Sequence, residues 1–106
     1  MSWTVVMLPE AEVDLESLDG SVRPQIVKSI IKVSQNPEYP NGYGKPLRNQ
    51  VYALGGLYKI KFKKVGIRVV YTLQREAEHM KIIIISTRAD EEVYKEAVKR
   101  RKKYNL

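Results

Sequence analysis

Three lysines alternate with apolar or aromatic side chains in the segment 58–63, which reads Tyr-Lys-Ile-Lys-Phe-Lys. Successive side chains of a β-strand point to opposite faces, so Lys59, Lys61 and Lys63 would share one face of a strand. Arg68 lies in the next apolar segment, and a hairpin in register would place it on the lysine face. The pattern therefore predicts a cationic surface on two neighbouring strands.

Two further polar groups could join this surface, because Arg88 follows the last expected strand and Tyr94 lies on the last expected helix. Lysine is a compact point charge, whereas arginine can bind a phosphate through two parallel hydrogen bonds. Clustered cations stabilise the dianionic phosphorane that forms when a 2′-OH of RNA attacks the adjacent phosphate. They also lower one another's pKa, so that a lysine can act as a base near neutral pH. A tyrosine among cations becomes more acidic, and its ring can stack on a base.

The candidate catalytic set is therefore Lys59, Lys61, Arg68, Arg88 and Tyr94. This chemistry needs no metal, and we expect neither a metal nor another cofactor. Structural interpretations compete with it. Alternating lysines often protect the edge of a sheet from pairing with another chain. A tyrosine beside Val93 at helical spacing is typical of core packing.

The elements that would position these residues follow the order β-α-α-β-β-β-α. Their expected bounds are strands at Trp3–Leu8, Tyr58–Lys63, Ile67–Leu73 and Met80–Ser86, a helix from Pro9 to about Gly20, a second capped by Ser21 and ending near Gln35, and a third capped by Asp90. We expect the first two helices to form an antiparallel pair. The fold class is α+β, a twisted, mostly antiparallel four-stranded sheet with helices against one face.

Three segments refine this expectation. The run Ile82–Ile85 is apolar on both faces, which predicts a central strand that is covered on both sides. Residues 36–56 are rich in proline and glycine and form a long irregular segment, of a kind that is often functional. The basic run Arg100–Lys103 suits the negative end of the last helix, and we expect it to be solvated.

The composition restricts the possible functions. The 106 residues are 43% hydrophobic and match one globular domain, residues 1–106. There is no cysteine and one histidine, which excludes disulfides, thiolate metal sites and a cysteine nucleophile. The net charge is +7, with 3 basic and 6 acidic residues in 1–43 but 16 and 6 in 44–106. This asymmetry indicates a polyanionic partner, foremost a nucleic acid, then an acidic protein tail or a membrane surface.

No apolar run reaches the roughly 20 residues of a membrane span, and the first residues lack the pattern of a secretory signal. We therefore expect a cytoplasmic protein without a membrane partner.

Several of these segments together resemble the RelE branch of the RelE/ParE toxins. They are Leu57–Phe62, Gly66–Tyr71, Arg88 and Val93–Arg100, preceded by Gly42–Leu47, which is similar to the segment before the first hairpin strand in many members. The resemblance covers nearly the whole chain and implies a RelE-like fold. It implies the toxin of a type II toxin–antitoxin pair, an endoribonuclease that enters the ribosomal A site and cuts mRNA there. The 2′-OH would attack the neighbouring phosphate and leave a 2′,3′-cyclic phosphate and a 5′-OH.

The resemblance also implies a role for each candidate residue. Lys59 and Lys61 match two strand lysines, of which one helps to deprotonate the 2′-OH while both stabilise charge. Arg68 matches the arginine that holds the scissile phosphate. Arg88 matches an arginine that protonates or stabilises the leaving 5′-oxygen. Tyr94 matches a helix tyrosine that orients or activates the nucleophile and stacks on the substrate.

Further cations would contact RNA or the ribosome, and the candidates are Lys45, Arg48, Lys63, Lys64, Arg101 and Lys102. Two positions depart from the family pattern and lower the local positive charge. Thr87 stands where some members have a lysine, and Asp90 stands where some have a second arginine.

The partners implied are a cognate antitoxin, the 30S A site with its mRNA, and operator DNA reached only through the antitoxin complex. Two alternatives stay open at this point. A ParE-like toxin has the same fold but binds DNA gyrase and cuts nothing. A non-catalytic nucleic-acid-binding domain would use the same cations without cleavage.

Overall fold

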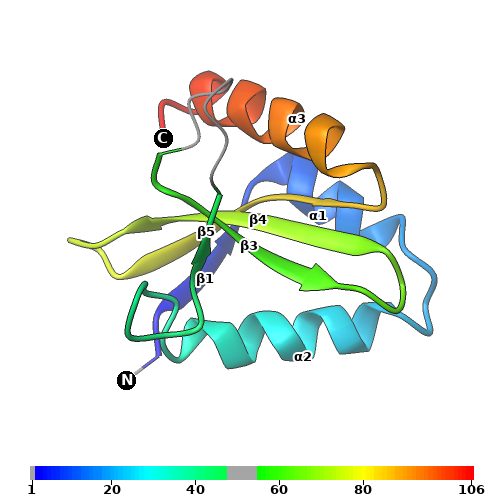
Figure 1. The fold of residues 1–106 in the computed structure, drawn as a ribbon, viewed down its shortest axis with the longest axis horizontal. Coiled ribbons are helices and arrows are strands. Elements are labelled where there is room, and N and C mark those ends of the chain that lie inside the picture. The colour runs from blue at the N-terminus through cyan, green and yellow to red at the C-terminus, as the bar shows by residue number, and fades with distance from the viewer. Residues whose placement is uncertain (1, 48–54) are drawn as a thin grey trace.

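A computed structural model of the chain, which describes residues 2–47 and 55–106, contains three helices and five strands in these ranges (Figure 1). Their bounds are β1 Thr4–Met7, α1 Pro9–Glu16, α2 Arg23–Ser34, β2 Lys45–Pro46, β3 Leu57–Phe62, β4 Ile67–Gln74, β5 His79–Ser86 and α3 Asp90–Lys103. The predicted order of strands and helices is confirmed, with β2 as an addition. Two residues are too short a strand to leave a periodic pattern in the sequence.

The strands form one sheet in the order β1-β5-β4-β3-β2. β1 runs parallel to β5, and the other three neighbouring pairs are antiparallel, so the predicted mostly antiparallel sheet is confirmed. β5 lies between β1 and β4, and Ile82–Ile85 are at most 2% exposed. The apolar run thus marks an inner strand, as expected from its composition.

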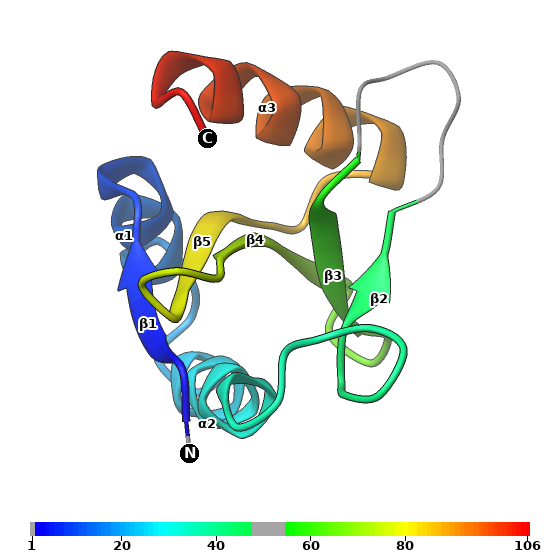
Figure 2. The ribbon, with the colours of Figure 1, turned by 90° about the vertical axis from the view of Figure 1, so that its left-hand side faces the viewer.

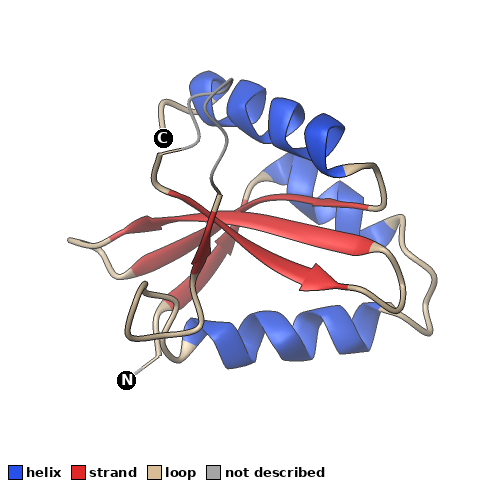
Figure 3. Ribbon diagram, in the orientation of Figure 1, coloured by secondary structure: helices blue, strands red, loops and turns tan. Residues whose placement is uncertain are grey.

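Helices cover both faces of the sheet, which corrects the expectation of a single covered face. α3 lies above the sheet and α2 below it in Figures 1 and 3, and the turned view of Figure 2 places them on opposite sides as well. The reason lies in the inner strands. Val69, Val70 and Tyr71 are consecutive in β4 and all have no exposed surface, so both faces of this strand are apolar and both require a cover.

The first two helices do not form a closely packed antiparallel pair, which is a second correction. α1 packs mainly on β5, whereas α2 contacts β1, and the two diverge from the link at residues 17–22. Ala11 of α1 and Ile26 of α2 have no exposed surface, and the main contacts of the two helices are with strands of the sheet. The area that the sheet offers outweighs what two short helices could bury between them.

The predicted helix caps are also wrong. Val22 stands at the N-cap of α2, and the Ser21 hydroxyl instead donates to a carboxylate oxygen of Asp19. Ala89 is the N-cap of α3, and Asp90 is the first helical residue. The Asp90 carboxylate contacts cations on the sheet, so tertiary contacts compete successfully with local capping at this position.

Arg100 fastens α3 to the rest of the molecule and is not the solvated residue that its place in a basic run suggested. Its side chain is 13% exposed. One Nη donates to Asp14 of α1 at 2.7 Å and to the Ile83 carbonyl at 3.0 Å, and Nε donates to Glu96 at 3.1 Å. Asp14 also accepts a hydrogen bond from the Ile85 amide. This network ties together α1, α3 and β5.

We predict that Arg100→Met lowers the free energy of unfolding by about 2–3 kcal/mol, because it leaves the partly buried Asp14 carboxylate without its cation. Urea denaturation measures the change. Lys99→Met is the matched control, since Lys99 is exposed on the same helix and should change stability by less than about 0.5 kcal/mol. Equal losses in the two variants would contradict the assignment.

A second prediction concerns the end of α3. Glu10 accepts hydrogen bonds from the Tyr104 hydroxyl at 2.6 Å and from Lys103 at 2.9 Å, and these contacts lower the pKa of the Glu10 carboxyl to about 2. A carboxyl whose pKa is lowered on folding stabilises the fold above its unfolded pKa of about 4.5 and loses this contribution as the pH falls towards about 2. We expect Glu10→Gln to be less stable than wild type at pH 6 and equally stable near pH 2, measured as the thermal midpoint. Glu12→Gln changes an exposed residue, so this variant should lose stability on acidification as wild type does. If the thermal midpoints of Glu10→Gln and wild type differed by the same amount at every pH, the proposed linkage would be contradicted.

Candidate anion-binding site

The register of β3 and β4 brings two predicted site residues together. Lys61 is directly opposite Arg68, and directly opposed residues of an antiparallel pair point to the same face. Gly66, at φ +66°, supports the tight turn that sets this register. The expectation that Arg68 lies on the lysine face is confirmed.

Asp90, at the start of α3, lies between these two cations. Its Oδ2 is 3.4 Å from Lys61 Nζ, and its Oδ1 pairs with Arg68 Nε. Arg68 is 20% exposed and also donates from Nη1 to the Arg88 carbonyl at 3.0 Å. Lys61 and Arg68 therefore form a seat for an anion, and in this structure the anion is a carboxylate of the chain itself.

Asp90 remains ionised in this position. Burial opposes the charge, but the positive charges of Arg68 and Lys61 and the hydrogen bonds that they donate outweigh it, so the pKa of Asp90 is lowered. Because the pair is partly exposed, another anion or water can replace the carboxylate without leaving a fully buried charge unpaired.

Tyr94 lies one turn after Asp90 on the same helix and is 8% exposed. Its hydroxyl is buried and has no hydrogen-bond partner among residues 2–47 and 55–106. Burial and the nearby negative charge of Asp90 raise the pKa of Tyr94, although Arg68 acts in the opposite direction. The expectation of a more acidic tyrosine is therefore wrong, and Tyr94 is a neutral phenol with an unused donor.

The other two candidates for catalysis lie at the rim of this seat. Arg88 is exposed in the link between β5 and α3, and its backbone carbonyl accepts a hydrogen bond from Arg68. Lys59 is half-buried on the same face of β3 as Lys61, two residues away. Both therefore lie in elements that adjoin the Lys61–Arg68 pair.

The expected RNA-binding cations fall into separate groups. Lys63 and Lys64 are exposed in the turn next to the Lys61–Arg68 pair, and Lys45 of β2 is exposed opposite Lys59. Arg101 and Lys102 lie near the far end of α3, where Arg101 donates to the Gly55 carbonyl. Arg48 lies outside the described residues.

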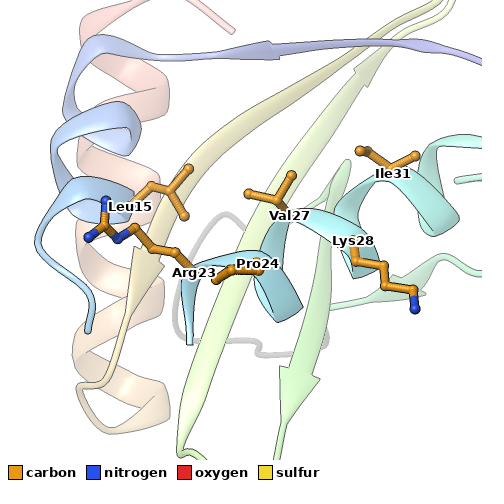
Figure 4. Close-up of a pocket in the computed structure, with 6 residues that line it drawn as sticks. All are labelled: Leu15, Arg23, Pro24, Val27, Lys28 and Ile31. Carbon is orange, nitrogen blue, oxygen red and sulfur yellow. The ribbon is translucent and has the colours of Figure 1, made fainter. Parts of the chain in front are cut away.

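A larger groove lies apart from the anion seat. An open groove of about 500 Å³ between α1 and α2 is predominantly apolar, although Arg23 and Lys28 contribute to it (Figure 4). Among the residues that the structure describes, its lining contains no carboxylate and no histidine. Residues 2–47 and 55–106 contain no cluster of three or more acidic or histidine side chains that could hold a metal ion. Within the same ranges, no helix is long and apolar enough to span a bilayer.

Comparison with known proteins identifies the family. The chain is 32% identical over 83 residues to the mRNA interferase toxin RelE of Escherichia coli K12. The aligned region covers 78% of this chain and 80% of the relative. The mRNA interferase RelE of Shigella flexneri matches to the same extent. The chain belongs to the RelE family. No family model matches the chain.

Solved structures of the RelE family have the same fold. A mutant of E. coli RelE in the free state matches with a TM-score of 0.77 at 29% identity, covering 94% of this chain and 98% of that chain. The same toxin with a RelBc antitoxin peptide matches with 0.71 at 29% identity over the same shares. The RelBE2 toxin–antitoxin complex of Mycobacterium tuberculosis matches with 0.67 at 25% identity, covering 85% and 95%. The RelE-like α+β fold and the resemblance to the RelE branch are confirmed.

Sequence reasoning identified Asp90 as a helix cap and as a departure from the RelE pattern that lowers the local positive charge, but not as the partner of Lys61 and Arg68. Its contacts with Lys61 and Arg68 join residues 22 to 29 positions apart, so no local pattern could reveal them. The one available signal was an acidic residue directly before the helix of the candidate tyrosine.

We predict that Asp90→Asn binds pyrophosphate more tightly at pH 7, by on the order of fivefold, because the side chain keeps its shape while its charge no longer competes for the cations. Isothermal titration calorimetry gives the affinity. Glu92→Gln removes an equal charge from an exposed position in the same helical turn and should change the affinity by less than about twofold. An equal gain in both variants would show an effect of net charge alone.

Proposed function

We propose that this chain is the toxin of a type II toxin–antitoxin system and acts as an mRNA endoribonuclease, an mRNA interferase. The observation that carries the proposal is the Lys61–Arg68 pair in direct register, with the unpartnered hydroxyl of Tyr94 on the adjacent helix. The relatives named mRNA interferase RelE support the reaction class.

In the proposed reaction Arg68 and Lys61 bind the scissile phosphate in the place of the Asp90 carboxylate. The 2′-oxygen forms a bond to phosphorus, and the bond from phosphorus to the 5′-oxygen breaks. Lys59 or Lys61 accepts the proton of the 2′-OH, and the cations stabilise the charge on the phosphorane. Arg88 stabilises or protonates the leaving 5′-oxygen. The products are a 2′,3′-cyclic phosphate and a 5′-OH.

Tyr94 has a narrower role in this proposal than an activated base. A phenol with a raised pKa stays protonated at neutral pH, so it can donate a hydrogen bond but is a poor proton acceptor. Its unpartnered hydroxyl would donate to the substrate and orient the nucleophile, and its ring would contact a base.

We assign the ribosomal A site as the place of cleavage. The seat is partly exposed and already holds a carboxylate, so a free RNA would compete poorly for it, whereas an mRNA presented by the ribosome needs little further ordering. The exposed Lys63 and Lys64 beside the seat would contact RNA backbones. This assignment places the chain in the cytoplasm.

We infer that a cognate antitoxin controls the activity, because the structural neighbours include a RelE toxin with a RelBc peptide and RelBE complexes. Contact with operator DNA would be made through that complex only.

The test is the double variant Lys59→Ala/Lys61→Ala. We expect it to lower the single-turnover rate of mRNA cleavage on programmed ribosomes by about 10²–10⁴-fold, since a proton acceptor and a charge stabiliser are lost together. Primer extension measures the cuts, and circular dichroism checks the fold. Lys28→Ala/Lys99→Ala removes two lysines from exposed helix positions and should cleave at the wild-type rate.

Undiminished cleavage by the Lys59/Lys61 variant would remove the catalytic assignment. Growth arrest with DNA damage and no mRNA cuts would indicate a gyrase-directed toxin instead. Binding to programmed ribosomes without any cleavage by wild type would indicate a non-catalytic RNA-binding domain.

A further inference from the structure

A groove of about 320 Å³ adjoins the anion seat on the opposite side of β3. One wall is the outer edge of β3, the second is α2, and the third is the segment that leads into β2. Within residues 2–47 and 55–106, no acidic residue lines it, and four lysines do. The lining side chains that matter here are Lys32, Tyr43, Lys45, Lys59 and Lys61. Because Lys61 lines both the groove and the seat, the two sites are continuous at this side chain.

The segment that carries Tyr43 is tightly built. A Cβ on Gly42 would lie 2.4 Å from the Asn36 carbonyl oxygen, and one on Gly44 would lie 2.5 Å from that of Pro37, so only glycine fits at either position. The Tyr43 amide donates to the Asn36 carbonyl at 2.8 Å. The buried Tyr71 hydroxyl donates to the Pro37 carbonyl at 3.1 Å and anchors the segment to the sheet.

This segment presents Tyr43 to solvent, although an aromatic ring is usually buried. Tyr43 is 47% exposed, and Lys32 Nζ lies 5.5 Å from its ring centre. The ring contributes little to the core, so stability does not explain a rigid segment that presents it. An exposed ring beside a cation is the arrangement with which proteins stack single-stranded bases and hold their phosphates.

β2 adds a second cation and leaves the groove open towards the seat. Lys45 is directly opposite Lys59, and β2 pairs with β3 only at Tyr58 and Lys59. Neither Lys45 nor Lys59 forms an ion pair within residues 2–47 and 55–106, in contrast to Lys61. Unpaired lysines on a continuous path would favour a phosphate backbone that crosses from the seat over the edge of the sheet.

We propose that this groove binds one nucleotide of single-stranded RNA beside the anion seat, with its base on Tyr43 and its phosphate held by Lys32 and Lys45. The inference rests on the proposed function, whose RNA occupies the adjoining seat. The groove is at the small end of ligand sites, which suits one nucleotide. The RNA is a flanking nucleotide of the mRNA or an unpaired nucleotide of ribosomal RNA.

The first test measures binding of an RNA probe to the isolated chain. The probe is a single-stranded hexaribonucleotide that is labelled with fluorescein and carries a 2′-deoxy sugar at every position except the ends. Tyr43→Ala should weaken the affinity by about tenfold, whereas Tyr43→Phe, which keeps the ring, should bind as wild type does. Lys32→Gln and Lys45→Gln should each reduce the slope of log affinity against log salt concentration by about the amount that one phosphate contact contributes. Lys28→Gln, exposed on the same helix but outside this groove, should not.

The second test identifies the source of the RNA. Tyr43 is replaced by a photo-crosslinking phenylalanine analogue, and the chain is irradiated on programmed ribosomes whose A-site codon carries the 2′-deoxy substitution. A crosslink to mRNA or to ribosomal RNA supports the groove as an RNA site and names its source. A crosslink to protein only, or to nothing, overturns it.

Failure of the inference and failure of the proposed function are separable. If wild type cleaves mRNA while Tyr43→Ala binds the oligonucleotide and cleaves as wild type does, the groove is not an RNA site and the nuclease assignment stands. If wild type does not cleave but Tyr43→Ala still loses oligonucleotide affinity and Tyr43→Phe does not, the groove binds RNA and the nuclease assignment fails. Absence of oligonucleotide binding by wild type overturns the groove.

Discussion

The site depends on the register of the β3–β4 hairpin. Lys61 and Arg68 form an anion seat only because they are directly opposed, and a shift of one residue would send the Arg68 side chain to the other face of the sheet. The turn at Gly66 and the buried side chains of β4 specify this register. The two neighbouring cations repel each other, and the Asp90 carboxylate between them offsets this repulsion.

α3 completes the site, and its own attachment is therefore part of the site's construction. Its first two turns supply Asp90 and Tyr94, while Arg100 and Lys103 bind its later turns to α1 and β5. Asp90, an ionised carboxylate, and Tyr94, a neutral phenol, lie one turn apart on this helix and have different properties. The carboxylate balances the charge of the cations, and within residues 2–47 and 55–106 the phenol has no hydrogen-bond partner.

Sequence patterns predicted most of the fold because the apolar periodicity of the long elements reports burial directly. The strands of the hairpin, the inner strand at Ile82–Ile85 and the three helices were found near their observed positions. The errors have one physical origin. The two-residue β2, the diverging α1 and α2, and the carboxylate of Asp90 are all decided by contacts with distant segments, which local propensity does not encode.

By itself, the sequence determined the α+β class, the lysine face of β3 and the similarity to the RelE branch. It also predicted that Arg68 lies on the lysine face. These properties follow from strand periodicity and from residue types in a recognisable order. Only the tertiary structure decided that Asp90 occupies the anion seat, that Tyr94 is a buried neutral phenol, and that Tyr43 lies in a lysine-lined groove along β3. Charge, burial and pKa depend on neighbours in space, and those neighbours come from elements far apart in the chain.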